Sequence, residues 1–204
     1  MLPFISMSQV VLTTPDGKIL FANSGKVMFS PKPLEIGDLY QGGVVAYFLQ
    51  PEDDGYVEGE VHGLIAGIFD LGLPNVGSRW FRLEGSYQNI NTTSERVGAG
   101  SANTTAIIAI QGSSGTTYAA RLCDEYISSE TGTGIYSDWY LPSLQELARL
   151  YLNRELIGGF NTTKTYWSSS ESGYYFSYAI NFAGGWTNIL GKENFYMIRP
   201  IRSF

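Results

Sequence analysis

Short apolar segments separated by turn residues recur along the whole chain, and this pattern predicts many strands. Near the N-terminus, three β-favouring triplets alternate with turn sequences, at residues 10–12, 19–21 and 27–29. Pro31-Lys32-Pro33 follows and predicts a stiff linker, because proline fixes φ and removes a backbone donor. We therefore expect residues 1–36 to form a short β-rich arm, joined to a domain over residues 37–204.

The pattern beyond the linker combines strands with helices. Nearly continuous apolar segments indicate buried strands at residues 44–49 and 62–68. Helices are expected over residues 103–111, over residues 116–128 and from Ser143 onward. The last has the clearest signal, since Ser143 and Glu146 are spaced as a capping box and Gly158 would end the helix. Helices in the middle of the chain, with strands on both sides, predict an α+β fold.

The C-terminal residues 166–204 alternate apolar and polar positions and contain two arginines in a charge-poor ending. This pattern predicts strands that complete the central sheet. We expect Trp167 and Phe182 to be buried and Arg199 and Arg202 to be hydrogen-bonded inside the domain.

Residues 172–191 contain no charged residue, although charged residues make up 16% of the chain. Tyrosine, serine, glycine and asparagine fill eleven of these twenty positions, and these residue types build adaptable recognition surfaces. Alternation assigns Tyr178, Ile180 and Phe182 to the core, so Ala179 is expected to face outward. The remaining positions predict a ligand-binding surface. Its candidate residues are Tyr174, Tyr175, Asn181, Trp186, Asn188, Ile189 and Asn194.

Composition and charge narrow the possible functions. The chain has 204 residues, of which 44% are hydrophobic, and this predicts a globular protein. Its net charge of −6 and the lack of a basic cluster argue against nucleic-acid binding. Its apolar segments are too short to insert into a membrane, and its first residues lack the features of a signal peptide. We expect synthesis in the cytoplasm, with any role outside the cell performed within a larger particle.

Few residues could support catalysis. His62 is the only histidine and Cys123 the only cysteine, and both lie in apolar segments where a structural role is expected. The acidic residues 52–54 could bind calcium, but a solvated loop is the simpler interpretation. A glycan hydrolase would need two acidic groups roughly 5–10 Å apart, and the uncharged segment offers only Glu171 and Glu193 at its flanks. We therefore expect no cofactor, no bound metal and no enzymatic activity.

Five ordered motifs resemble a bacterial and phage family of C-type-lectin-like domains. They lie at residues 42–47, 62–66, 138–147, 166–171 and 198–204. The family includes the C-terminal domains of some bacterial collagen-like adhesins and the variable proteins of diversity-generating retroelements. The resemblance implies a C-type-lectin-like fold whose C-terminal strands and loops display the ligand surface. It also implies a role in attachment, often as a trimer, and in phages a place at the tip of a tail fibre.

The sequence and the resemblance together predict a receptor-binding or adhesion protein at the tip of a phage tail fibre. Its ligand would be a glycan or a protein on the host surface, and its location the virion. Two alternatives stay open: a structural virion or baseplate component that binds no receptor, and an adhesin on a bacterial cell surface. The expected partners are further copies of the chain, preferably as a homotrimer, and tail or baseplate proteins that contact residues 1–36.

Overall fold

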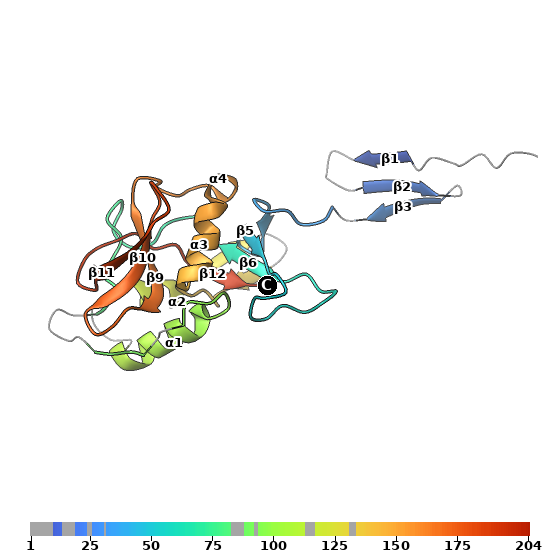
Figure 1. The fold of residues 1–204 in the computed structure, drawn as a ribbon. Coiled ribbons are helices and arrows are strands. Elements are labelled where there is room, and N and C mark those ends of the chain that lie inside the picture. The colour runs from blue at the N-terminus through green and yellow to red at the C-terminus, as the bar shows by residue number, and fades with distance from the viewer. Residues whose placement is uncertain are drawn as a thin grey trace, which may run out of the picture. The chain divides into compact units, whose positions relative to one another are not determined.

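The computed structural model describes residues 10–13, 19–23, 26–30, 32–82, 88–91, 94–112, 117–130 and 134–204. The chain divides into two compact units, Met1–Glu35 and Ile36–Phe204, one residue before the division expected from the sequence. The smaller unit contains one antiparallel sheet in the order β1-β2-β3 (Figure 1). Its strands are β1 (Val10–Thr13), β2 (Ile19–Asn23) and β3 (Lys26–Ser30), which confirms the three predicted strands.

The larger unit contains three antiparallel sheets in the described residues. Four strands pair in the order β12-β6-β5-β4: β4 (Leu39–Tyr40), β5 (Gly43–Phe48), β6 (Gly63–Ala66) and β12 (Ile201–Ser203). Three pair in the order β11-β10-β9: β9 (Thr165–Glu171), β10 (Phe176–Asn181) and β11 (Thr187–Gly191). A two-stranded sheet consists of β7 (Ser128–Glu130) and β8 (Gly134–Tyr136).

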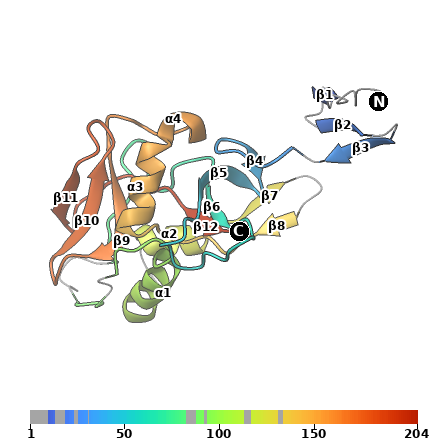
Figure 2. The same cartoon turned by 45° about the vertical axis from the view of Figure 1, so that its right-hand side comes forward.

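Four short helices pack around these sheets. They are α1 (Gly100–Gln111), α2 (Ala119–Asp124), α3 (Leu144–Leu152) and α4 (Arg154–Ile157). Helix α3 lies between the β9–β11 sheet and the four-stranded sheet, and α1 packs against β9 (Figure 2). No helix in the described part of the chain is long and apolar enough to cross a membrane.

The prediction of an α+β, C-type-lectin-like fold is wrong, because the protein is mainly β. Twelve strands in antiparallel sheets dominate the described residues, and the helices are few and short. The helix expected over residues 116–128 is only the six residues of α2. The helix expected over residues 103–111 is confirmed as α1 (Gly100–Gln111). The length of α2 was overestimated because apolar residues at helical spacing do not show where tertiary packing ends a helix.

The predicted start of α3 at Ser143 is confirmed. The Ser143 hydroxyl accepts a hydrogen bond from the Glu146 amide at 3.3 Å, and the Glu146 carboxylate accepts one from the Ser143 amide at 2.7 Å. Glu146 is buried and also accepts from the amide of Gly98. Burial nevertheless raises the pKa of Glu146 to about 7, because desolvation disfavours the carboxylate more than its donors favour it. Gly158, with φ of 73°, ends the separate helix α4, whereas α3 ends at Leu152, so the single helix expected from Ser143 to Gly158 is two helices.

Both faces of β10, the middle strand of the β9–β11 sheet, contribute side chains to the core. Ile180 belongs to a hydrophobic cluster that also contains Leu147 of α3, whereas its neighbour Ala179 belongs to a second cluster with Trp167 and Trp80. Successive residues of a strand point to opposite faces, so each face of β10 contributes to a different cluster. The prediction that Ala179 faces outward is therefore wrong, because its side chain is completely buried.

The predicted burial and bonding at the C-terminus are confirmed. Trp167 and Phe182 are buried. Arg199 donates from Nε to Asp70 at 2.7 Å, and Arg202 donates to both carboxylate oxygens of Asp138 at 2.7 and 2.9 Å. Only β12 extends the four-stranded sheet, however, so the prediction that all of residues 166–204 complete one central sheet is wrong.

Candidate ligand-binding surface

Five of the seven candidate residues lie at the ends of β10, and the other two, Asn188 and Ile189, lie within β11. Tyr174 and Tyr175 lie in the connection from β9 to β10, whereas Trp186 lies in the connection from β10 to β11. The six residues of β10, at roughly 3.3 Å each, place these ends about 20 Å apart. Asn194 belongs to the first end, since its amide donates to the carbonyl of Gly191, which pairs with the first residue of β10. The predicted surface is therefore two separate surfaces.

Three consecutive aromatic side chains form the first surface, which we name the aromatic hairpin (Tyr174, Tyr175 and Phe176). Their exposed fractions are 47%, 53% and 46%. The rings contact one another edge to face, with centroids 4.7 Å apart for the first pair and 6.4 Å apart for the second. Phe176 was not among the predicted residues, although the run of three aromatics was a signal for it. The aromatic hairpin presents an apolar, polarisable surface to solvent.

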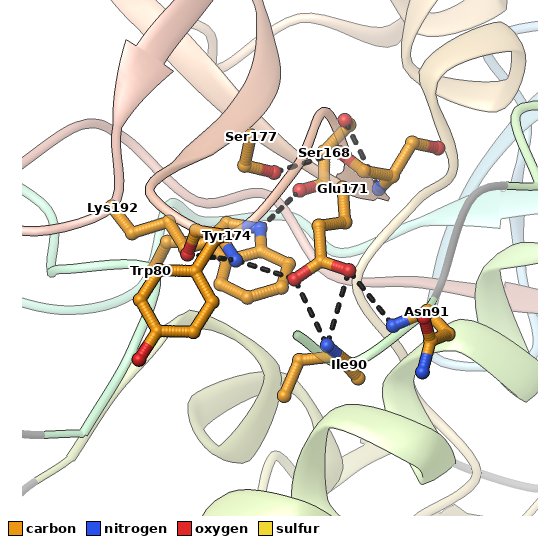
Figure 3. A network of polar contacts seen from close by, with 9 residues as sticks. Trp80, Ile90, Asn91, Ser168, Glu171, Tyr174, Ser177 and Lys192 are labelled. Atoms are coloured by element: carbon orange, nitrogen blue, oxygen red, sulfur yellow. Dashed lines mark hydrogen bonds and ion pairs between the residues drawn. The ribbon is translucent and has the colours of Figure 1, made fainter. Parts of the chain in front are cut away.

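A buried ion pair lies beneath the aromatic hairpin (Figure 3). Glu171, the last residue of β9, pairs with Lys192, the residue after β11, and both side chains are shielded from solvent. The Lys192 ammonium also donates to the carbonyl of Tyr174 at 3.0 Å, and its backbone amide donates to the carbonyl of Tyr175 at 3.0 Å. Lys192 thus holds two successive backbone carbonyls of the turn.

The carboxylate of Glu171 has further donors that hold it in place. The backbone amides of Ile90 and Asn91 donate to it at 2.8–3.1 Å (Figure 3). The ammonium of Lys192 lies 4.7 Å from the centroid of the Trp80 ring, which adds a cation–π contact. Burial lowers the pKa of Lys192, and Glu171 opposes this shift by stabilising the charged form. The aromatic hairpin is therefore ordered without a ligand, which reduces the entropy that binding must cost.

The residues of the second surface, around Trp186, make contacts within the turn between β10 and β11. Trp186 is exposed, but its ring lies against the backbone of Gly184, where any Cβ would collide with it. The side chain of Asn181 donates to Thr165 at 3.2 Å and accepts from the amide of Ala183 at 2.9 Å. The structure therefore gives Asn181 a role inside the turn.

Asn188 and Ile189 lie on β11, the edge strand of the three-stranded sheet. Asn188 pairs with the buried Ala179, and Ile189 pairs with Tyr178, so the two side chains point to opposite faces of the sheet. Asn188 is half-buried, whereas Ile189 is exposed. A ligand that binds one face of the sheet could therefore not contact both Asn188 and Ile189.

The residues considered for catalysis have structural surroundings. His62 lies just before β6, and its ring nitrogens contact Glu60 at 2.8 Å and the carbonyl of Phe204 at 3.2 Å. Glu60 raises the pKa of His62 by hydrogen bonding. Cys123 is completely buried, which raises the pKa of its thiol and disfavours the thiolate nucleophile. Asp53, in the acidic loop, accepts hydrogen bonds from Tyr47 and from the amide of Gln50.

No group of three histidine, cysteine, aspartate or glutamate residues that could hold a metal ion occurs in the described ranges. Of the two acidic residues that flank the uncharged segment, Glu171 forms the buried ion pair with Lys192. The absence of enzymatic activity stays a prediction.

Comparisons with known proteins bear on the fold. No protein-family model matches the chain, and no curated protein sequence matches it significantly. Among solved structures, it is similar to a fimbrial protein from Bacteroides ovatus ATCC 8483, with a TM-score of 0.53 and 15% sequence identity. The alignment covers 93% of this chain and 57% of that one, so this chain spans little more than half of that structure. At this identity the similarity shows the fold alone, and it supports the β-rich architecture over the predicted C-type-lectin-like fold.

Proposed function

We propose that the protein is a non-enzymatic, adhesin-like protein of a bacterial surface that contacts its ligand through the aromatic hairpin. The observation that carries this proposal is that the aromatic side chains are exposed while the backbone that bears them is held by buried contacts. Three consecutive aromatic side chains are about half exposed, and a buried ion pair holds the backbone beneath them. Exposed aromatic rings on a fixed backbone are typical of recognition surfaces, because they bury large areas at little entropic cost.

A bacterial surface is favoured over the tip of a phage tail fibre by the similarity to a fimbrial protein. No observation on this chain favours a virion over a cell surface. The ligand is a glycan or a protein on the surface of another cell. Assembly as a trimer, and contacts of residues 1–36 with other proteins, stay predictions.

The aromatic hairpin favours a ligand whose contacts are apolar and neutral. Tyrosine rings stack on the C–H faces of sugars and on apolar side chains, and their hydroxyls hydrogen-bond to either. Binding through such contacts depends little on salt, because no ion pair with the ligand is screened.

Binding of the full chain to a glycan array and to a panel of bacterial and animal cells tests the proposal. We expect the Tyr174→Ser/Tyr175→Ser double variant to bind at least about thirtyfold more weakly, as loss of an interface hot spot of about 2 kcal/mol predicts. The matched control is Phe69→Ser, which removes an aromatic side chain that is 68% exposed elsewhere in the larger unit. Equal losses in both variants, or no loss in the double variant, would overturn the proposal.

A further inference from the structure

A third surface, separate from the aromatic hairpin and from the surface around Trp186, lies around Phe195, four residues beyond the end of β11. Phe195 is 42% exposed and lines two clefts, one of about 540 Å³ and one of about 300 Å³. Its ring is therefore a shared wall between two adjoining depressions. We name the two clefts together the Phe195 groove. Two adjoining clefts suit a ligand with repeating units better than a single small molecule.

The charge of the Phe195 groove is opposite to that of the protein. Its described lining contains Arg79, Arg82 and Lys164 and no aspartate or glutamate. The whole chain carries 19 acidic and 13 basic residues. Basic side chains therefore supply all the charge in the described lining of an acidic protein, which favours an anionic ligand.

Arg79 is poised to receive such a ligand. Its guanidinium lies 4.9 Å from the centroid of the Phe195 ring, so the two side chains share one wall. Its Nε atom is buried and has no hydrogen-bond partner among the described residues. Because Nε is shielded from solvent, a ligand in the cleft would contact the terminal nitrogens of the guanidinium, and a carboxylate can accept two parallel hydrogen bonds from a guanidinium. Arg82 is held nearby by Gln111, whose carbonyl accepts from it at 3.2 Å.

The remaining lining is uncharged and mixes apolar side chains, such as Leu73, Leu122 and Met197, with polar ones. Short hydroxyl and amide side chains face both clefts: Ser78, Thr117, Asn75, Thr163 and Thr165. Together with the aromatic rings of Phe195 and Tyr196, such groups suit a ligand that has both hydroxyl groups and apolar C–H faces.

We propose that the Phe195 groove binds an acidic saccharide, with a sugar carboxylate on Arg79 and a sugar ring against Phe195. The choice of a saccharide over other anions rests on the proposed function, whereas the anionic character rests on the groove alone. This site is distinct from the aromatic hairpin, since the two surfaces have no residue in common. The turn at Lys192 joins them, because it bonds to Tyr175 on one side and precedes Phe195 on the other.

Calorimetric titration of the full chain with oligogalacturonate tests the inference. Its methyl ester, which lacks the carboxylate charge, is the control ligand. We expect the acid to bind, the ester to bind at least about tenfold more weakly, and added salt to weaken binding of the acid. Arg79→Gln should lower the affinity for the acid about tenfold or more. The control Arg96→Gln removes a charge that is 65% exposed and pairs with Asp54 outside the groove, and it should leave the affinity unchanged. Should Arg79→Gln fail to fold, Phe195→Ser takes its place, and the same loss is expected.

Equal affinity for acid and ester, an unchanged affinity in the groove variant, or the same loss in the Arg96 control would overturn the inference. Tighter binding of poly-glutamate than of oligogalacturonate would also overturn it, in favour of an acidic peptide. The two proposals can fail separately. Cell binding that depends on Tyr174 and Tyr175 without any binding of oligogalacturonate refutes the groove alone. The opposite outcome refutes the role of the aromatic hairpin alone.

Discussion

Replacing Lys192 with methionine probes the buried ion pair that holds the aromatic hairpin. Methionine has a similar length and no charge, so Lys192→Met removes the ammonium and leaves the carboxylate of Glu171 buried without its cation. Among the described residues, only the backbone amides of Ile90 and Asn91 would remain as its donors. Breaking one side of a buried ion pair costs about 3–5 kcal/mol, and we expect the free energy of unfolding to fall by that amount at pH 7.

Equilibrium unfolding in urea, followed by tryptophan fluorescence, measures this loss. The double variant Glu171→Gln/Lys192→Met removes both charges, and we expect it to be far less destabilised than the sum of the two single variants. The control Lys164→Met removes an exposed lysine and should change stability by less than about 0.5 kcal/mol. Additive single effects, or a loss in Lys192→Met no larger than in the control, would refute the reasoning that the pair is buried and coupled.

Two further predictions concern the start of α3. Burial raises the pKa of Glu146 to about 7 in the folded protein, so the stabilisation from protonating it is complete below about pH 4.5 and is lost as the pH rises through 7. A shift from 4.5 to about 7 corresponds to about 3 kcal/mol, and urea unfolding between pH 5 and 8 should show this dependence in the wild type and lose it in Glu146→Gln. Ser143→Ala removes the acceptor for the Glu146 amide and should lower the unfolding free energy by about 1–2 kcal/mol in the same assay, and an unchanged value would contradict the cap.

Features determined by neighbouring residues could be predicted from the sequence. The capping box depends on two residues three positions apart, and Gly158 does end a helix, although the break between α3 and α4 before it was not predicted. The strands β5 and β6 follow from continuous apolar segments. These signals depend on neighbouring residues, so they can be interpreted without knowledge of the rest of the fold.

Features determined by tertiary packing could not be predicted. Alternation along β10 correctly assigned Ile180 to the core but could not show that the opposite face, with Ala179, is covered too. The uncharged segment indicated exposed aromatics, yet it did not show that a strand separates Tyr175 from Trp186. The sequence identified Glu171 only as an acidic flank of that segment and did not predict its ion pair, because its partner Lys192 is 21 positions away in the sequence.

The central claim is that the aromatic hairpin binds the ligand. The affinities of the wild type and two variants for the same ligand test this claim most directly. The ligand is whichever glycan or cell the wild type binds, and the variants are Tyr174→Ser/Tyr175→Ser and Trp186→Ala, which alter opposite ends of β10. We expect the double variant to lose at least about thirtyfold in affinity and Trp186→Ala to lose less than about threefold, with all three melting temperatures within a few degrees. A large loss in Trp186→Ala with full binding by the double variant would contradict the account and place the ligand at the other end of the strand.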